Sequence, residues 1–113
     1  MNISKNVIDG VTFIVIEENE ADLSNSETFK KMVAEEIENG ERRIGISFKN
    51  VEYVDSSFLG ALVAILKLLL PLSGKLVLFD MNNDIINLFQ LTKLDQIFKL
   101  KTSAEEALKE LNG

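Results

Sequence analysis

The chain has 113 residues, 46% of them hydrophobic, which is the size and composition of a single globular domain. Its 12 basic and 18 acidic residues give a net charge of −6, which disfavours binding to the phosphate backbone of nucleic acids. There is no Cys and no His, so disulfides, Cys/His zinc sites and nucleophiles activated by His are excluded.

The N-terminal segment predicts a β-hairpin. Two β-type runs, Ile3–Ile8 and Val11–Ile16, flank Asp9-Gly10, and Asp-Gly is a strong turn signal because both turn residues need positive φ. The second run is apolar on both faces, so we expect a strand covered on both sides of a sheet. Residues 1–9 lack the continuous apolar core of a signal peptide, and we expect a cytoplasmic protein.

An acidic loop, Glu17–Leu23, precedes the first predicted helix. Its carboxylates could hold a hard cation, but the loop lacks the spaced Asp/Asn positions and the Gly of a calcium loop. We therefore predict a solvated loop and no metal site. Ser24 and Glu27 match a capping box, with Ser24 as the N-cap of a helix that Asn39-Gly40 ends.

The next strand and helix enclose the most informative stretch of the chain. Arg42–Phe48 predicts a strand, and Asp55–Gly60 leads from it into an apolar helix that continues to Leu70. Ser56 therefore lies at a predicted helix N-terminus, where unpaired N–H groups and the helix dipole accommodate a phosphate. The alternative is that Ser56 is simply the N-cap of this helix.

This second helix is apolar on all sides. Phe58–Leu70 has one charged residue, Lys67, but it is shorter than the roughly 20 residues that a membrane span needs. Such a helix is either buried against a neighbour or covers a partner, and the sequence leaves both open. We expect Phe58 to be partly exposed beside Ser56 as an interface anchor, and Gly60 to permit a close helix contact.

The rest of the chain continues the alternation of strands and helices. Ser73-Gly74-Lys75 is a helix-to-strand turn, because it lacks the first Gly and the final Ser/Thr of a phosphate-binding loop. The last predicted helix opens with a capping box, Ser103 to Glu106. The remaining predicted elements are a strand at Lys75–Phe79, a helix from Ile85 to Leu91, a strand at Ile97–Leu100, and that final helix through Leu111.

The order ββαβαβαβα predicts an α/β domain with a mixed, mostly parallel central sheet and helices. In such sheets, sites form outside the carboxyl ends of the strands. The Asp55-Ser56 turn follows a strand and opens a helix, so we expect it to lie at that end.

The stretch Asp55–Gly60 (Asp-Ser-Ser-Phe-Leu-Gly) resembles the Asp-Ser-Ser-Gly-Leu-Gly signature of STAS domains of the anti-sigma-factor antagonist type. Glu20-Ala21-Asp22 is similar to the family's Glu-Leu-Asp segment, and Thr92–Phe98 is similar to its segment before the last strand. The element order also agrees. The resemblance covers essentially the whole chain and implies one STAS-like domain over residues 1–113. Phe58 departs from the pattern, which has Gly there.

The resemblance implies a protein–protein switch, not an enzyme, with no cofactor. In that family an ATP-dependent anti-sigma kinase phosphorylates the serine that follows the Asp. The unphosphorylated form binds the anti-sigma factor and frees the sigma factor, and a serine phosphatase resets the cycle. Carried onto this sequence, the phosphoacceptor is Ser56. The implied partner-binding residues are Asp22, Asp55, Ser56, Ser57, Phe58 and Leu59.

Two alternatives to the phosphorylation switch remain. One is a phosphorylation-independent interaction or scaffold module of the same fold. The other is a small nucleotide-binding or nucleotide-hydrolysing protein, which has the least support because the sequence holds no phosphate-binding loop. No reading of the sequence calls for a membrane partner.

Overall fold

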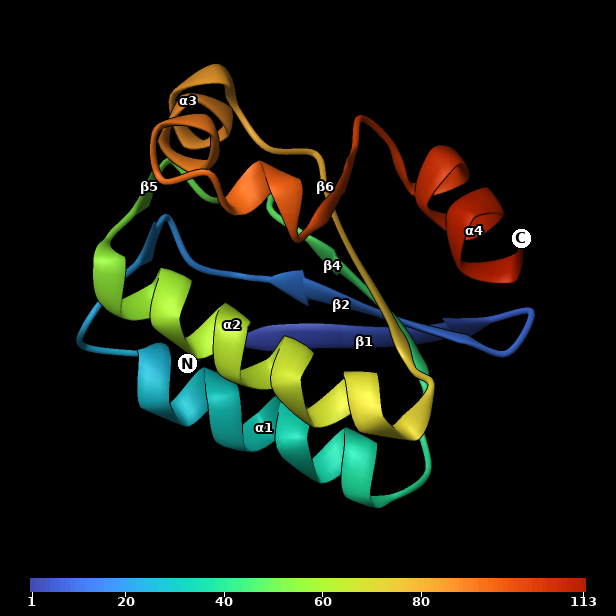
Figure 1. The fold of residues 1–113 in the computed structure, drawn as a ribbon. Helices are drawn as coiled ribbons and strands as arrows, with labels where there is room; N and C mark the ends of the chain where they lie inside the picture. Colours follow the sequence, from blue (N-terminus) through green and yellow to red (C-terminus); the bar gives the residue numbers. More distant parts are fainter.

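The computed structural model describes residues 1–113, and it contains a five-stranded sheet, a separate two-stranded sheet and four α-helices (Figure 1). The strands are β1 (Ile3–Ile8), β2 (Val11–Ile16), β3 (Glu20–Ala21), β4 (Arg43–Ser47), β5 (Tyr53–Val54), β6 (Lys75–Phe79) and β7 (Lys99–Lys101). The α-helices are α1 (Ser26–Glu38), α2 (Ser56–Leu69), α3 (Asn83–Leu91) and α4 (Ala104–Asn112), and two short 3₁₀ helices are η1 (Leu70–Leu72) and η2 (Leu94–Gln96).

The five-stranded sheet has the order β1-β2-β4-β6-β7. Only the β1–β2 pair is antiparallel, and the other three pairs are parallel. This confirms the predicted mixed, mostly parallel sheet. The hairpin turn is also as predicted, because Asp9 and Gly10 both have positive φ, at 50° and 77°.

Helices cover both faces of this sheet. Figure 1 shows α1 and α2 side by side on one face and α4 on the other. Side chains alternate along β2, so Ile14 and Ile16 join the cluster beneath α1 and α2, whereas Val11 and Phe13 join the cluster beneath α4. A strand that is apolar on both faces is therefore buried on both, as the sequence predicted.

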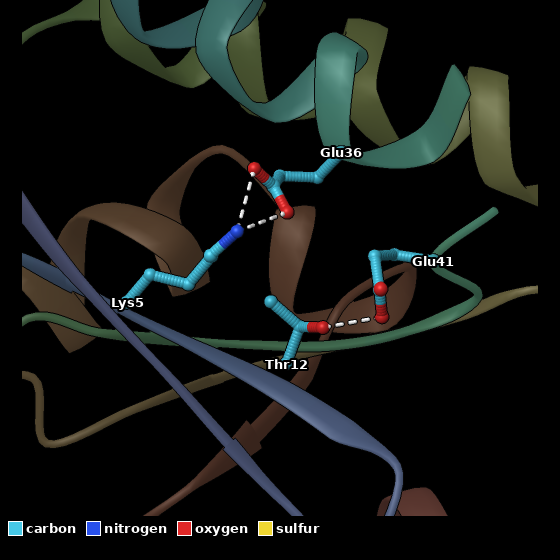
Figure 2. Close-up of polar contacts among 4 residues, drawn as sticks. All are labelled: Lys5, Thr12, Glu36 and Glu41. Carbon is cyan, nitrogen blue, oxygen red and sulfur yellow. Dashed lines mark hydrogen bonds and ion pairs between the residues drawn. The ribbon is translucent and has the colours of Figure 1, made fainter. Parts of the chain in front are cut away.

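Two polar contacts attach the hairpin to α1 and to the segment after it. Figure 2 shows the Lys5 ammonium against the Glu36 carboxylate, at 3.0 and 3.2 Å from its two oxygens. It also shows the Thr12 hydroxyl donating to the Glu41 carboxylate. Thr12 is fully buried, and a buried hydroxyl needs such a partner. These contacts attach β1 and β2 to α1 and to the segment that follows it.

The first helix begins later than the capping box predicts. Its N-cap is Asn25, and the Ser24 hydroxyl instead donates to the Asp22 carboxylate at 2.6 Å. The prediction of Ser24 as N-cap is wrong because the N–H groups of Asn25 and Ser26 both donate to the Asp22 carbonyl in a turn before the helix, so Ser26 is the first helical residue. The end of the helix is as predicted, with Asn39 as C-cap and Gly40 at a φ of 105°.

Differences near the C-terminus are smaller. The last strand is β7 at Lys99–Lys101, two residues later than its predicted start at Ile97, because η2 and its C-cap occupy the preceding residues. Ser103 caps α4 as predicted, accepting from the Glu106 N–H at 3.2 Å. The Glu106 carboxylate accepts from the N–H and hydroxyl of Thr102, which closes the turn before the helix.

The apolar helix α2 is mostly interior. Its buried residues face α1 and the sheet, and its exposed apolar side chains gather at the C-terminal end, where Leu68 is 44% and Leu70 is 61% exposed. Of the two possibilities left open by the sequence, burial against a neighbour therefore accounts for most of this helix. The buried residues are Phe58, Leu59, Ala61, Leu62, Ile65 and Leu69. None of the helices is both long and apolar enough to cross a membrane.

The expectation of a close contact at Gly60 is wrong. Gly60 is exposed, and a Cβ built there meets no atom within 4 Å. The close approach lies at Gly74, where a Cβ would come within 2.6 Å of a Leu69 side-chain carbon and 3.0 Å of the Arg42 carbonyl oxygen. The glycine with crowded surroundings is therefore Gly74, in the turn after α2, and not Gly60, in the first turns of α2.

This contrast predicts opposite effects of the same substitution. Gly60→Ala should raise the free energy of unfolding by up to about 1 kcal/mol, because Ala replaces Gly in an uncrowded helix. Gly74→Ala should lower it, because the new methyl group meets backbone as well as side chain. Urea denaturation of both variants and the parent measures this. A Gly60→Ala variant less stable than the parent would contradict the open environment.

Candidate functional site

The two-stranded parallel sheet of β3 and β5 carries the candidate site. Ala21 pairs with Val54, and both are buried, whereas the preceding pair, Glu20 and Tyr53, is exposed. The alternation of side chains thus points one residue of each strand inward and the other outward. Asp55, directly after β5, donates its N–H to the Ala21 carbonyl at 3.1 Å, which brings together the ends of the two strands.

The Asp55 carboxylate connects this small sheet to α2 and to the loop after β3. Its Oδ1 accepts from the Phe58 N–H at 3.1 Å, so Asp55 is the N-cap of α2. Its Oδ2 accepts from the Leu23 N–H at 3.0 Å. Ser56 is therefore the first residue of the helix and not its cap, which corrects the alternative raised from the sequence. Its side chain is exposed, and that of Ser57 is half-buried.

The loop Asp22–Asn25 is held by its own polar side chains. The Asp22 Oδ1 accepts from the Ser24 N–H at 2.9 Å and from the Ser24 hydroxyl. The Asn25 side chain accepts from the Asp22 N–H at 3.0 Å and donates to the Glu20 carbonyl at 2.8 Å. The hydrogen bond from the Ser24 hydroxyl is the main cause that lowers the pKa of Asp22 below the ordinary value of an aspartate.

Phe58 and Leu59 do not reach the surface of this site. Phe58 is fully buried and Leu59 is 5% exposed. The Phe58 ring lies 4.9 Å from the Phe29 ring of α1 and 6.4 Å from the Phe48 ring after β4, centroid to centroid. The expectation of a partly exposed Phe58 is wrong, because rings from two distant segments close around the first turn of α2.

The exposed apolar residues near Ser56 are different ones, which the sequence analysis did not single out. Leu23 is 74% exposed and Tyr53 is 56% exposed. The sequence signals that could have identified these two residues as exposed are a single Leu between polar residues, for Leu23, and a Tyr before a Val, for Tyr53. Neither is strong, since a two-residue strand gives no readable alternation.

The candidate site therefore combines an exposed hydroxyl at a helix N-terminus with two carboxylates and two exposed apolar side chains on the segments that Asp55 joins. The residues named from the sequence that meet here are Asp22, Asp55, Ser56 and Ser57. No three acidic side chains of the chain converge closely enough to hold a metal ion. A helix N-terminus favours a covalently attached phosphate, and exposed apolar side chains favour contact with a protein.

Comparison with known proteins gives consistent matches over nearly the whole chain. The family model described as STAS domain matches residues 2–107. The chain is 34% identical over 101 residues to a candidate anti-sigma factor antagonist of Thermotoga neapolitana. The aligned residues cover 88% of this chain and 89% of the relative.

Solved structures agree with this match. A crystal structure of a candidate anti-sigma factor antagonist from Thermotoga maritima superimposes with a TM-score of 0.89 at 29% identity, covering 98% of this chain and 95% of that one. The Bacillus cell fate determinant SpoIIAA in its phosphorylated form has a TM-score of 0.73 at 19% identity, over 97% of this chain and 99% of that one. At that identity the second match shows the shared fold alone.

Burial of Phe58 predicts a large loss of stability on truncation. Phe58→Ala should lower the free energy of unfolding by about 3–5 kcal/mol, because it leaves a cavity beside the rings of Phe29 and Phe48. Leu91→Ala is the control, since Leu91 is 82% exposed and should change stability little. Urea unfolding curves compare the two. Equal stability of both variants would show that the Phe58 ring is not in the core.

The hydrogen bonds to Asp22 predict a measurable titration. Ser24→Ala should raise the pKa of Asp22 toward the ordinary value of an aspartate, because the hydroxyl that stabilises the carboxylate is lost. The lowered pKa in the folded state means that Asp22 contributes stability above its unfolded pKa, and that this contribution is lost as the pH falls through the folded value. NMR titration of the side-chain carboxyl carbon measures both pKa values. No difference between parent and variant would refute the assignment.

Proposed function

We propose that this chain, which belongs to the STAS domain family, acts as an anti-sigma factor antagonist. It binds an anti-sigma factor through the surface around Ser56, and phosphorylation of Ser56 ends the binding. Membership of a family of regulatory binding proteins follows from the matches. The partner, the residue and the switch are the proposal.

The observation that carries the proposal is the position of Ser56. It is the first residue of α2, its side chain is exposed, and the N-cap role is filled by Asp55. Its hydroxyl is thus not needed to start the helix. The first N–H groups of a helix have no intrahelical partner, and the dipole places partial positive charge there. A phosphate on Ser56 is therefore compatible with the fold.

A phosphate on Ser56 would change the charge and shape of the surface that the partner contacts. Phosphorylation adds about −1.5 to −2 charges, beside the carboxylate of Asp55 and close to the loop that carries Asp22. A partner complementary to the unmodified surface then meets added bulk and like-charged neighbours. The fold of phosphorylated SpoIIAA, which this chain shares, supports a modification that leaves the architecture intact.

The enzymes of the cycle are separate proteins in this proposal. A serine kinase associated with the anti-sigma factor adds the phosphate, and a serine phosphatase removes it. The chain itself acts by binding, in the cytoplasm, without a cofactor. A scaffold module that binds without phosphorylation remains the alternative, and phosphoacceptor status separates the two.

The first test maps the phosphate. Incubated with an anti-sigma kinase from the same cells and ATP, the parent and Ser57→Ala should each take up one phosphate, and Ser56→Ala should take up none. Peptide mass spectrometry identifies the modified residue. Ser57→Ala is the matched control, since it removes the neighbouring hydroxyl. Phosphate found only on Ser57, or on neither serine, would contradict the proposal.

The second test measures the switch. Ser56→Asp should fold like the parent, because its charge lies at the favourable end of the helix, but should bind the anti-sigma factor at least about tenfold more weakly. Ser56→Ala should keep the affinity of the parent. Calorimetric titration of both variants compares them. Equal affinities for Asp and Ala at this position would exclude a charge switch and favour the scaffold alternative.

A further inference from the structure

Leu23 is an apolar side chain that the fold exposes and holds in place at the same time. It is 74% exposed, in the loop between β3 and α1. A side chain that gains nothing from burial in the chain itself is ordinarily mobile. Here the residues around it make a network of hydrogen bonds that fixes the backbone from which it projects.

The network involves each residue of the loop. The Leu23 N–H donates to the Asp55 Oδ2, and the residues on either side of Leu23 are joined through the Asp22 carboxylate and the Ser24 N–H. The N–H groups of Asn25 and Ser26 both donate to the Asp22 carbonyl, which leads the loop directly into α1. A loop ordered before binding loses less conformational entropy when a partner contacts it, so more of the contact energy appears as affinity.

Tyr53 is a second large side chain that is exposed near the end of the small sheet. It lies on the outward side of the small sheet, opposite Glu20 in the register, and it is 56% exposed. Tyrosine and other large side chains set in a surface are the residues that most often dominate protein interfaces. Leu23 and Tyr53 both come from the segments that Asp55 joins, and Asp55 directly precedes Ser56.

The charges within the two segments that carry these side chains have one sign. The acidic residues on β3, on β5 and at their ends are Glu20, Asp22, Glu52 and Asp55. The segments from Glu20 to Asn25 and from Glu52 to Ser57 contain no Lys or Arg. Complementary charge is what steers a partner to such a surface and fixes its orientation. The partner that fits carries Lys or Arg side chains around an apolar pocket.

We propose that Leu23, supported by Tyr53, is the apolar anchor of this surface, and that it enters an apolar pocket of the anti-sigma factor bordered by basic side chains. This rests on the proposed function, because it names how the same partner is held. Asp55 acts as a positioning residue, since it holds the backbone of Leu23 and the start of the helix that carries Ser56. The serine provides the control point, and Leu23 provides the affinity.

The test compares two leucines of the full-length chain. Leu23→Ala should bind the anti-sigma factor about thirtyfold more weakly, the loss typical of an anchor residue, and should keep the melting temperature of the parent. Leu70→Ala is the matched control. Leu70 is 61% exposed and lies at the opposite end of α2, a helix about 21 Å long, so this variant should bind like the parent.

Added salt tests the charge complementarity. Raising the salt concentration should weaken binding of the parent, because it screens the attraction between the acidic surface and a basic pocket border. Affinity that is unchanged or stronger in high salt would overturn the basic border.

The remaining outcomes separate the two proposals. If Leu23→Ala and Leu70→Ala bind equally well while Ser56→Asp is impaired, the anchor is wrong and the proposed function stands. If the parent chain binds no anti-sigma factor, the proposed function fails and the anchor fails with it. A lower melting temperature of Leu23→Ala, with binding retained in the folded fraction, would assign Leu23 a structural role instead.

Discussion

One carboxylate, that of Asp55, holds together the segments from which the surface around Ser56 is built. Its two oxygens accept from the N–H groups of Phe58 and Leu23, at 3.1 and 3.0 Å. The backbone of the same residue donates to Ala21. Hydrogen bonds to a charged acceptor are stronger than those between neutral groups. The beginning of α2, the end of β3 and the loop that follows β3 therefore have fixed positions relative to one another.

The residue that separates the site from the core is Phe58. Its N–H contributes to the cap at the surface, and its ring packs with Phe29 and Phe48 in the interior. The family pattern has Gly at this position, and the structure gives the departure a physical reason, which is that the ring fills the space between α1 and the end of β4. The exposed apolar surface beside Ser56 is then provided by residues of the neighbouring loop and strand.

Most of the fold follows from short-range patterns. The Asp9-Gly10 turn, the apolar run of β6 and the Gly40 helix end each carry their signal within a few residues, and the structure confirms them. The family signature also lies within six consecutive residues, Asp55–Gly60, and it predicts the site from them alone. Two-residue strands such as β3 and β5 have no such signal, because their pairing depends on segments more than 30 residues apart.

Side-chain partners were the least predictable part. Ser24 fits a capping pattern, yet its hydroxyl donates to the Asp22 carboxylate. Phe58 is predicted to be exposed from its place at a helix start, but in the fold it packs against the Phe29 ring of α1. Each outcome depends on which groups the tertiary fold brings close, and local propensity does not contain that information. The fixed position of Leu23 could not be predicted for the same reason, since its N–H donates to Asp55, a residue 32 positions away in the sequence.

Amide hydrogen exchange of the parent and of Asp55→Ala tests this account most directly. If the Asp55 carboxylate joins the loop to the helix, the N–H groups of Leu23 and Phe58 exchange slowly in the parent, and both exchange faster in the variant while amides of the central strands keep their protection. Unchanged exchange at Leu23 in Asp55→Ala would contradict the account, because the loop would then be ordered without the carboxylate on which the site is argued to depend.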